Sequence, residues 1–462
     1  MSPIVSRSAL AAPRRMLSAA ALFACALFAG WPAGATQADA VLPSQDWVHE
    51  SGARVVFYPA DALPMVDARL IFDAGAVRDH DETAGLASLT ATLLSEGAGK
   101  MDAGTFSRAV DELGAEFSAS ARLESAAVRL RSLSDPDRLW PAVDLVTAVL
   151  ERPQFPEAAF ERERKRQLLG IRARQQQPQA VASDALRAAL YPDHPYGRPD
   201  IGTAESVAAL TLEQLRDFHR QYYVAANALL VIVGDLDRAG AERLADRWLS
   251  ALPVGRAAPD LPPVPALDEA QTVEVPFPSE QYTVLVGYSG VARNHPDYLP
   301  LYLGNHVLGG SGFASRLMSD LRERRGLAYS VYSYLMPLRA GGSLVMGIQT
   351  RPEAVGQARQ LMHAELESFV AEGPTREELT DSQANVVGGL ALNLDSNAKI
   401  LERLASLAYL GLPLDYYDDY RERVRDITPP VVRAAFERHV NPEHRVTVVV
   451  GPVGNERPEA NE

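Results

Sequence analysis

The sequence predicts an α+β protein made of two homologous halves, each an antiparallel-rich sheet covered by helices, joined by a proline-rich linker. Three observations support this: separated runs of strand-like and helix-like periodicity, a proline cluster near residue 255, and one segment that recurs late in each half. The chain has 462 residues, more than one hydrophobic core usually organises, so at least two domains are expected.

The first half contains separated strands and helices. Extended apolar patterns at 53–58 and 66–72 predict two paired strands, a hairpin is expected at 115–121 and 126–133, and a buried strand at 229–233. Helical periodicity predicts helices at 84–94, 103–113, 139–151, 156–175, 180–190 and 212–223.

The second half repeats the design of the first. Residues 211–234 align without a gap on 428–451, which keeps a Thr, an Arg and a Gly in register and reads both times as helix, turn, buried strand and Gly. If the halves are copies, 282–288 is the counterpart of 66–72, and 299–308 is the counterpart of the helix at 84–94. The expected organisation is a signal peptide (1–40), an N-terminal domain (41–252), a linker (253–270), a C-terminal domain (271–454) and a flexible tail (455–462).

The N-terminus is typical of a secretory signal peptide. Arg7, Arg14 and Arg15 precede an apolar run that ends at Trp31, and small residues follow it. Cleavage is expected after Ala40, with a second candidate site after Ala35. The run is too short for a spanning helix, so we expect a periplasmic or secreted protein without membrane insertion.

Charge and cysteine content exclude several classes of function. The formal net charge is −14, and it becomes about −16 when the leader's three Arg and one Asp are removed, so nucleic acid is an unsuitable partner. Cys25 is the only cysteine and lies in the leader. The mature chain would therefore have no disulfide, no thiolate nucleophile and no Cys-ligated metal.

Several motifs in order resemble the pitrilysin/insulinase family of zinc peptidases over nearly all of the mature chain. They are Gly85-Leu86-Ala87, His194-Pro195-Tyr196, Phe218-His219 and the segment Ser315 to Tyr334. Active members carry HxxEH on a helix and a later Glu as third ligand, because two His one turn apart and a Glu form an open zinc site.

The resemblance implies that this chain lacks the zinc site. The positions of the two His and the Glu of HxxEH read Ser88, Thr92 and Ala91, and the family's 76-residue interval leads from Thr92 to Leu169 for the third ligand. Hydroxyl groups are poor zinc ligands, and Ala and Leu have no ligating atom. The nine His residues show no ligand spacing, and we interpret His219 and His306 as packing or surface residues.

The family's substrate-binding pair is retained. In the run Leu321 to Tyr329 the resemblance places an Arg and a Tyr seven residues apart, Arg322 and Tyr329, toward the bound peptide near the zinc. A guanidinium and a phenol are hydrogen-bond donors suited to a peptide carbonyl. A solvated helix end at Arg322 and a half-buried strand residue at Tyr329 are the alternative interpretations. The glycine-rich run 308–312 resembles the family's loop at the mouth of the chamber.

The resemblance thus implies a subunit without catalytic residues of its own, inactive alone, which adds an Arg/Tyr pair to a zinc-bearing HxxEH partner that hydrolyses oligopeptides. Zinc is expected in that partner and not in this chain. One alternative is an inert scaffold or peptide-binding protein of the same fold. Another, a zinc peptidase with unorthodox ligands, is disfavoured because no alternative ligand cluster is evident in the sequence.

Overall fold

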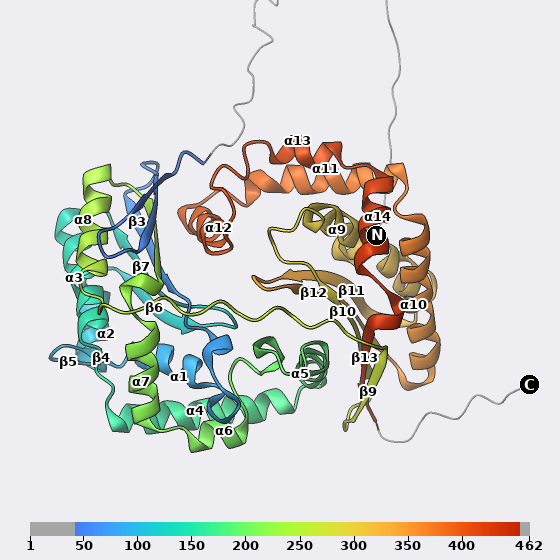
Figure 1. Ribbon diagram of the computed structural model, residues 1–462, viewed down its shortest axis with the longest axis horizontal. Coiled ribbons are helices and arrows are strands. Elements are labelled where there is room, and N and C mark those ends of the chain that lie inside the picture. The colour runs from blue at the N-terminus through green and yellow to red at the C-terminus, as the bar shows by residue number, and fades with distance from the viewer. Residues whose placement is uncertain (1–41, 453–462) are drawn as a thin grey trace, which may run out of the picture. The chain divides into compact units, whose positions relative to one another are not determined.

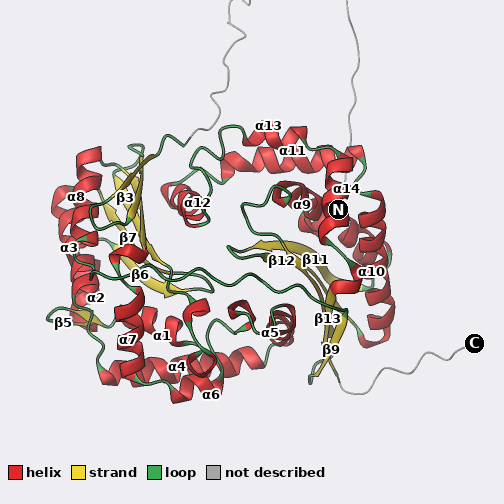
Figure 2. Cartoon of the chain, in the orientation of Figure 1, coloured by secondary structure: helices red, strands yellow, loops and turns green. Residues whose placement is uncertain are grey.

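The computed structural model describes residues 42–452 (Figure 1). The expected signal peptide and C-terminal tail lie outside these residues. The described chain is a mixed α+β structure with two main sheets, each flanked by helices (Figure 2). No helix in this range is long and apolar enough to cross a bilayer.

The first sheet has six strands in the order β1-β2-β8-β3-β7-β6. Their bounds are β1 Gln45–Val48, β2 Arg54–Pro59, β8 Ala228–Gly234, β3 Met65–Phe72, β7 Ala126–Leu133 and β6 Glu116–Ala121. The predicted pairing of 53–58 with 66–72 is wrong, because β8 lies between β2 and β3, parallel to one and antiparallel to the other. Strand β8 is buried on both faces, which suits the centre of a sheet better than an edge.

The second sheet repeats this order. It runs β11-β12-β10-β13-β9, with bounds β11 Ala328–Pro337, β12 Gly342–Thr350, β10 Tyr282–Gly290, β13 Arg445–Gly451 and β9 Gln271–Pro276. Its only parallel pair is β13 with β9, as β2 with β8 is in the first sheet. Asp67 faces Val233 in the first sheet, and Thr283 faces Val450 in the second. These equivalent registers confirm the duplication predicted from the repeated segment.

Fourteen α-helices are described. Those of the first half are α1 Leu86–Leu93, α2 Ala103–Glu112, α3 Pro136–Glu151, α4 Glu157–Gln175, α5 Pro178–Leu190, α6 Ala204–Ala209, α7 Leu212–Tyr222 and α8 Arg238–Leu249. Those of the second half are α9 Tyr298–Asn305, α10 Val355–Glu372, α11 Arg376–Leu392, α12 Asn397–Tyr409, α13 Tyr420–Asp426 and α14 Pro429–His439. The predicted helices are confirmed within a few residues. The sequence did not predict β1, β9, β12, α6, α8 or the helices α10 to α13 of the second half.

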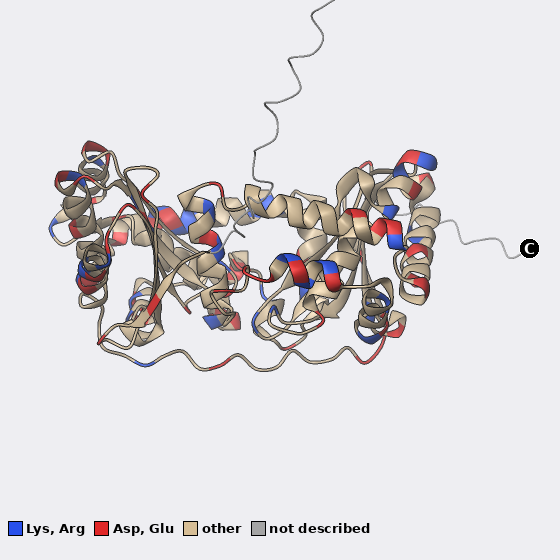
Figure 3. Ribbon diagram, turned by 90° about the horizontal axis from the view of Figure 1, so that it is seen from above, with Lys and Arg blue, Asp and Glu red and all other residues tan. Residues whose placement is uncertain are grey.

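Residues 253–270 contain no helix or strand, and most of them are exposed. Figure 3 shows this segment as an extended run, and the charged residues of both signs as intermixed on the helices. The prolines explain the extended conformation, since they fix φ and cannot donate a backbone hydrogen bond.

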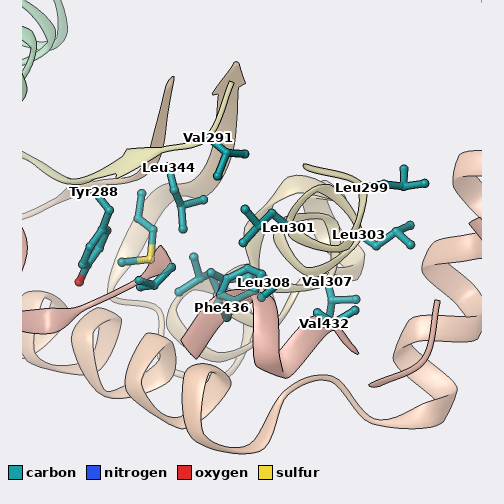
Figure 4. Close-up of a cluster of buried hydrophobic side chains, with 14 of the residues drawn as sticks. Tyr288, Val291, Leu299, Leu301, Leu303, Val307, Leu308, Leu344, Val432 and Phe436 are labelled. Atoms are coloured by element: carbon teal, nitrogen blue, oxygen red, sulfur yellow. The ribbon is translucent and has the colours of Figure 1, made fainter. Parts of the chain in front are cut away.

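One face of each sheet is covered by helices of its own half. In the second half α9 packs against α14, and their side chains interdigitate with those of the sheet (Figure 4). The helices approach so closely that a Cβ at Gly304 would lie 2.3 Å from Cε2 of Phe436. Only glycine fits at this contact.

The other face of each sheet is covered by a helix from the opposite half. Helix α5 belongs to the first half, yet its Leu186 and Leu190 share a buried cluster with Leu285 and Val448 of the second sheet. A Cβ at Gly287 of β10 would lie 2.8 Å from Cδ1 of Leu190. In the same way α12 of the second half packs on β3 and β8 of the first. The two halves therefore exchange equivalent helices.

A buried polar network ties the β11–β12 turn to the first half. The Arg339 guanidinium pairs with Asp73 at 2.8 Å, and its backbone N–H donates to Oε1 of Glu124 at 3.0 Å. The hydroxyl of Tyr196, from the His-Pro-Tyr motif, donates to the same Oε1 at 2.6 Å and accepts from the Ala340 N–H at 3.0 Å. The motif therefore has a structural role between the halves.

The exchange predicts that the halves stay together when the linker is cut. Each fully buried apolar side chain of α5 or α12 stabilises the association by about 1.5–3 kcal/mol. We expect a chain with a specific protease site inserted between Pro259 and Asp260 to elute after cleavage as one species on size exclusion. Separation of the fragments without denaturant would show that the exchanged helices contribute little to cohesion.

Candidate functional site

Helix α1, which would carry HxxEH in an active relative, has a firmly fixed N-terminus. The Asp79 carboxylate accepts hydrogen bonds from the backbone N–H groups of Gly85 at 2.8 Å and Ala87 at 3.0 Å. Its burial raises the pKa of Asp79 to about 7, against the lowering effect of these bonds. From α4, Nε2 of Gln167 donates to the Gly85 carbonyl at 3.0 Å. The frame of the site is thus intact.

The residues at the ligand positions of α1 do not fit zinc. Ser88 and Thr92 lie one turn apart on one side of the helix, as two His ligands would. The Thr92 hydroxyl donates to the Ser88 carbonyl at 2.9 Å, so it is engaged within its own helix. Ala91 is buried and offers no atom to a metal. No metal chemistry can be derived from these side chains.

The third-ligand position on α4 also lacks a ligand. Leu169 is 63% exposed. Helix periodicity puts Gly170, rather than Leu169, on the side of Gln167 and of the buried Glu163, three and seven residues earlier. A Cβ at Gly170 would meet no atom within 4 Å. Whichever of the two residues occupies the position, it provides no ligating side chain.

Glu163 is the buried carboxylate of α4, and it is already paired. Its Oε1 accepts from Nε of Arg162 at 2.9 Å, and its Oε2, which accepts no hydrogen bond from the described residues, lies in ion-pair range of Nη1 of Arg166 at 3.0 Å. Two guanidinium partners compensate the cost of burying this charge, so Glu163 needs no metal.

His219 and His306, interpreted from the sequence as packing or surface residues, make ring contacts and a hydrogen bond. The His219 ring stacks on Tyr223 with centroids 4.9 Å apart and meets Phe155 edge-on at 5.3 Å. This burial lowers the pKa of His219 to about 4. His306 lies at the C-terminal end of α9, and its Nε2 is 3.2 Å from Oδ1 of Asn385. Within residues 42–452, neither ring is hydrogen-bonded to a second His or to a carboxylate.

One His/Asp cluster escaped the sequence analysis. His295, Asp297 and His439 come from distant segments, and one possible ligand atom of each lies within 4.8 Å of the others. Nδ1 of His295 accepts from the Asp297 N–H at 3.1 Å, and Nε2 of His439 lies 2.8 Å from Asp297 Oδ2. Arg438 also donates two hydrogen bonds to the Asp297 carboxylate, from Nε and from Nη2. No alternative ligand cluster is evident in the sequence, whereas the structure places three possible ligand atoms close together. Hydrogen bonds already engage the Asp297 carboxylate and one ring nitrogen of each histidine.

Arg322 differs from the two arginines beside it. It lies in a π-helical turn, Met318–Arg324, a feature common at functional sites. Arg324 and Arg325 both pair with Asp320, at 3.1 and 3.0 Å. Arg322 has no carboxylate partner among the described residues, and its nearest polar contact is Sδ of Met318 at 3.9 Å. Arg322 is also half-buried, whereas Arg324 and Arg325 are exposed, so the solvated-face interpretation suits Arg324 and Arg325 better than Arg322.

Tyr329 is presented outward by a β-bulge. Ala328 pairs with Thr350 and Ser330 with Gln349, so Tyr329 is an extra residue in β11 without a partner in β12. A bulge re-aims a side chain, and Tyr329 is 73% exposed. The Arg322 guanidinium lies 5.9 Å from the centre of the Tyr329 ring. The structure thus brings together the two residues predicted as a pair, which the sequence could not show.

The glycine-rich run 308–312 packs closely against β11, the strand that carries Tyr329. A Cβ at Gly309 would lie 2.5 Å from the backbone N of Ser333 in β11. Gly312 has φ of +63°, a conformation that other residues rarely adopt. Phe313 follows it, 65% exposed, with the Arg322 guanidinium 5.1 Å from its ring centre. The sequence analysis did not single out Phe313, although a bulky apolar residue in a glycine-rich turn is the signal that marks it.

Two family models match the chain. "Insulinase (Peptidase family M16)" matches residues 55–204, and "Peptidase M16 inactive domain" matches residues 209–386. An uncharacterized zinc protease of Mycobacterium tuberculosis is 30% identical over 414 residues, which is 88% of this chain and 92% of that protein. A non-peptidase homolog of Helicobacter pylori is 23% identical over 397 residues, 85% of this chain and 90% of that protein.

Solved structures of M16-type proteins are similar to this chain. The M16 inactive domain from Pseudomonas fluorescens superposes with a TM-score of 0.86 at 36% identity, covering 90% of this chain and all of that one. A protease from Helicobacter pylori has a TM-score of 0.81 at 21% identity, over 88% of this chain and 99% of that one, and shows likeness of fold alone.

The erased ligand positions predict that the purified chain holds no stoichiometric zinc. Elemental analysis after dialysis against trace zinc should find far less than one zinc per chain. A His439→Gln variant is the control, because zinc lost with this change would belong to the His/Asp cluster. One tightly held zinc that survives the change would contradict our interpretation of α1 and α4.

The buried His219 predicts an acid-sensitive stability. Its folded pKa is depressed, so the stabilisation is complete above the unfolded pKa and is lost as the pH falls from about 6.5 to about 4. The loss in the free energy of unfolding should approach about 3 kcal/mol. We expect His219→Phe to lack this part of the pH dependence in urea titrations, whereas the exposed His444→Gln should retain it. Equal profiles for all three proteins would disprove the assignment.

Proposed function

The chain belongs to the M16 (insulinase) family of peptidases as a non-catalytic homologue, and from this premise we propose that it is the Arg/Tyr-bearing subunit of a heteromeric peptidase. In this proposal a homologous partner carries HxxEH and the zinc. This chain contributes Arg322 and Tyr329 to the binding of an oligopeptide, and neither subunit cleaves peptides alone.

The observation that supports this proposal best is the pair formed by the half-buried Arg322 and the exposed Tyr329. Arg322 has no carboxylate partner among the described residues, whereas its neighbours Arg324 and Arg325 are held by Asp320. Tyr329 stands out of β11 on a bulge, 73% exposed. Neither arrangement serves the packing of the fold, so a ligand explains both better than stability does.

The chemistry of the pair suits a peptide carbonyl. A phenol donates one hydrogen bond and a guanidinium donates several, and both become stronger as negative charge develops on the oxygen during attack. Water exclusion by the bound peptide would strengthen them further. The pair would therefore bind the carbonyl modestly in the ground state and more tightly in the transition state, while the chain itself needs no metal.

Export is part of the proposal. The signal-like segment 1–40 lies outside the described residues, and the mature chain would be free of cysteine. A periplasmic or secreted peptidase complex fits both features, because its stability would not depend on the redox state of its compartment.

A scaffold or peptide-binding role without hydrolysis is the second candidate. The absence of ligating side chains at the positions that the resemblance assigns to zinc favours a scaffold as much as it favours a peptidase subunit. The Arg322/Tyr329 pair distinguishes them, since a scaffold has no use for a guanidinium that lacks a carboxylate partner within residues 42–452 and lies next to a tyrosine on a bulge.

Substitution of the pair tests the proposal. In the complex reconstituted with the zinc-bearing partner, Tyr329→Phe removes one donor and leaves the ring, and Arg322→Lys keeps the charge but loses the fork. We expect each change to lower peptide turnover roughly a hundredfold, about 3 kcal/mol in transition-state stabilisation, without loss of assembly on size exclusion.

Matched controls lie in the same segments. Arg324→Lys changes an arginine of the same turn that is paired with Asp320, and Tyr334→Phe removes a hydroxyl from the same strand. Both should cleave at close to the unmodified rate. If the Arg322 and Tyr329 variants assemble and cleave as fast as these controls, the pair has no catalytic role, and the scaffold function becomes the better explanation.

A further inference from the structure

Exposed aromatic side chains are confined to one short segment. Within residues 42–452 the exposed aromatic residues are Phe313, Tyr329 and Tyr334. A single exposed apolar side chain needs no explanation, but a grouping of all of them does. The two most exposed, at 65% and 73%, are Phe313 and Tyr329, and both meet the guanidinium of Arg322.

The turn that carries Phe313 is held in a defined conformation by local contacts. Gly312 has a positive φ, and the hydroxyl of the buried Ser315 donates to the Gly312 carbonyl at 2.6 Å. A 3-10 turn over Gly312–Ala314 connects them. Phe313 is therefore held in solvent by an ordered turn, at a cost of about 1.5–3 kcal/mol relative to a buried phenylalanine.

The distance between the rings limits where a ligand would meet Phe313. Each ring centre lies within 6 Å of the same guanidinium carbon, so the two centres are at most about 11 Å apart, the sum of these distances. An extended peptide advances about 3.3–3.6 Å per residue. A peptide whose carbonyl is held by Tyr329 would thus place a side chain on Phe313 within about three residues of that carbonyl.

We propose that Phe313 is a specificity-determining residue that forms an apolar subsite beside the Arg322/Tyr329 pair. The preferred substrates are oligopeptides with a large apolar or aromatic side chain within three residues of the cleaved bond. The inference rests on the proposed function and adds the substrate class to it. Burial of such a side chain against Phe313 supplies binding energy that a small polar residue does not.

Paired peptides test the proposal in the reconstituted complex. The cleavage site of one parent peptide is first mapped by mass spectrometry, and versions with Phe or Ser are made at each of the three positions on either side. At the position that meets Phe313, the unmodified complex should prefer Phe over Ser roughly tenfold or more in kcat/KM. Phe313→Ala should bring this ratio close to one, and Phe313→Leu should retain part of it.

The isolated chain provides a second measurement that needs no hydrolysis. Fluorescence anisotropy of the labelled Phe and Ser peptides should show tighter binding of the Phe peptide by the unmodified chain, and equal binding by Phe313→Ala. The control is Leu392→Ala, which removes another exposed apolar side chain, 69% exposed at the end of α11, and should leave both ratios unchanged.

The outcomes separate this inference from the function on which it rests. Rates unaffected by the Arg322 and Tyr329 changes would overturn the proposed function. Rates that depend on this pair, with a Phe/Ser preference that Phe313→Ala does not alter, would overturn only the subsite. Loss of assembly in Phe313→Ala together with equal peptide binding before and after the change would assign the ring to the partner interface instead.

Discussion

The structure depends on the exchange of one helix between its two halves. Helix α5 covers the second sheet and α12 covers the first, so each sheet has one apolar face that its own half cannot bury. A sheet must cover such a face to be stable in water. Neither half is complete alone, and the polar contacts of Arg339 with Asp73 and Glu124 add directional bonds to an association that burial drives.

This constraint also determines how the candidate site is held. Strand β11 is an edge strand, but its turn into β12 is bonded to the first half through Arg339, and its middle packs closely on Gly309. The bulged Tyr329 and the neighbouring Arg322 therefore project from a strand and a turn that are held at several points. Substrate-binding groups on such supports are positioned more accurately than groups on free loops.

The frame of the zinc site persists without its ligands for a related reason. Asp79 and Gln167 hold the start of α1 through backbone groups, and these contacts do not depend on the residues at positions 88 and 92. The packing of α1 and α4 is required by the core, whereas the residues at the positions that the resemblance assigns to zinc make no contact on which this packing depends. Ser and Thr can therefore occupy these positions without disturbing the helix, which agrees with the family likeness over nearly the whole chain.

The sequence alone indicated most helices and strands of the first half, the duplication, and the absence of ligating side chains at the positions that the family resemblance assigns to zinc, because periodicity is local and a ligating atom belongs to its residue. It also indicated Arg322 and Tyr329, through their spacing within a known motif. Only the tertiary structure decided that β8 separates β2 from β3, that α5 and α12 change places, and that His295, Asp297 and His439 meet. It alone showed that Asp320 pairs with Arg324 and Arg325, and that Arg322 has no carboxylate partner within residues 42–452. It also showed that Arg322 lies beside the exposed rings of Tyr329 and Phe313. These features depend on contacts between segments far apart in the chain or on a shift in strand register, and residue patterns carry no direct record of either.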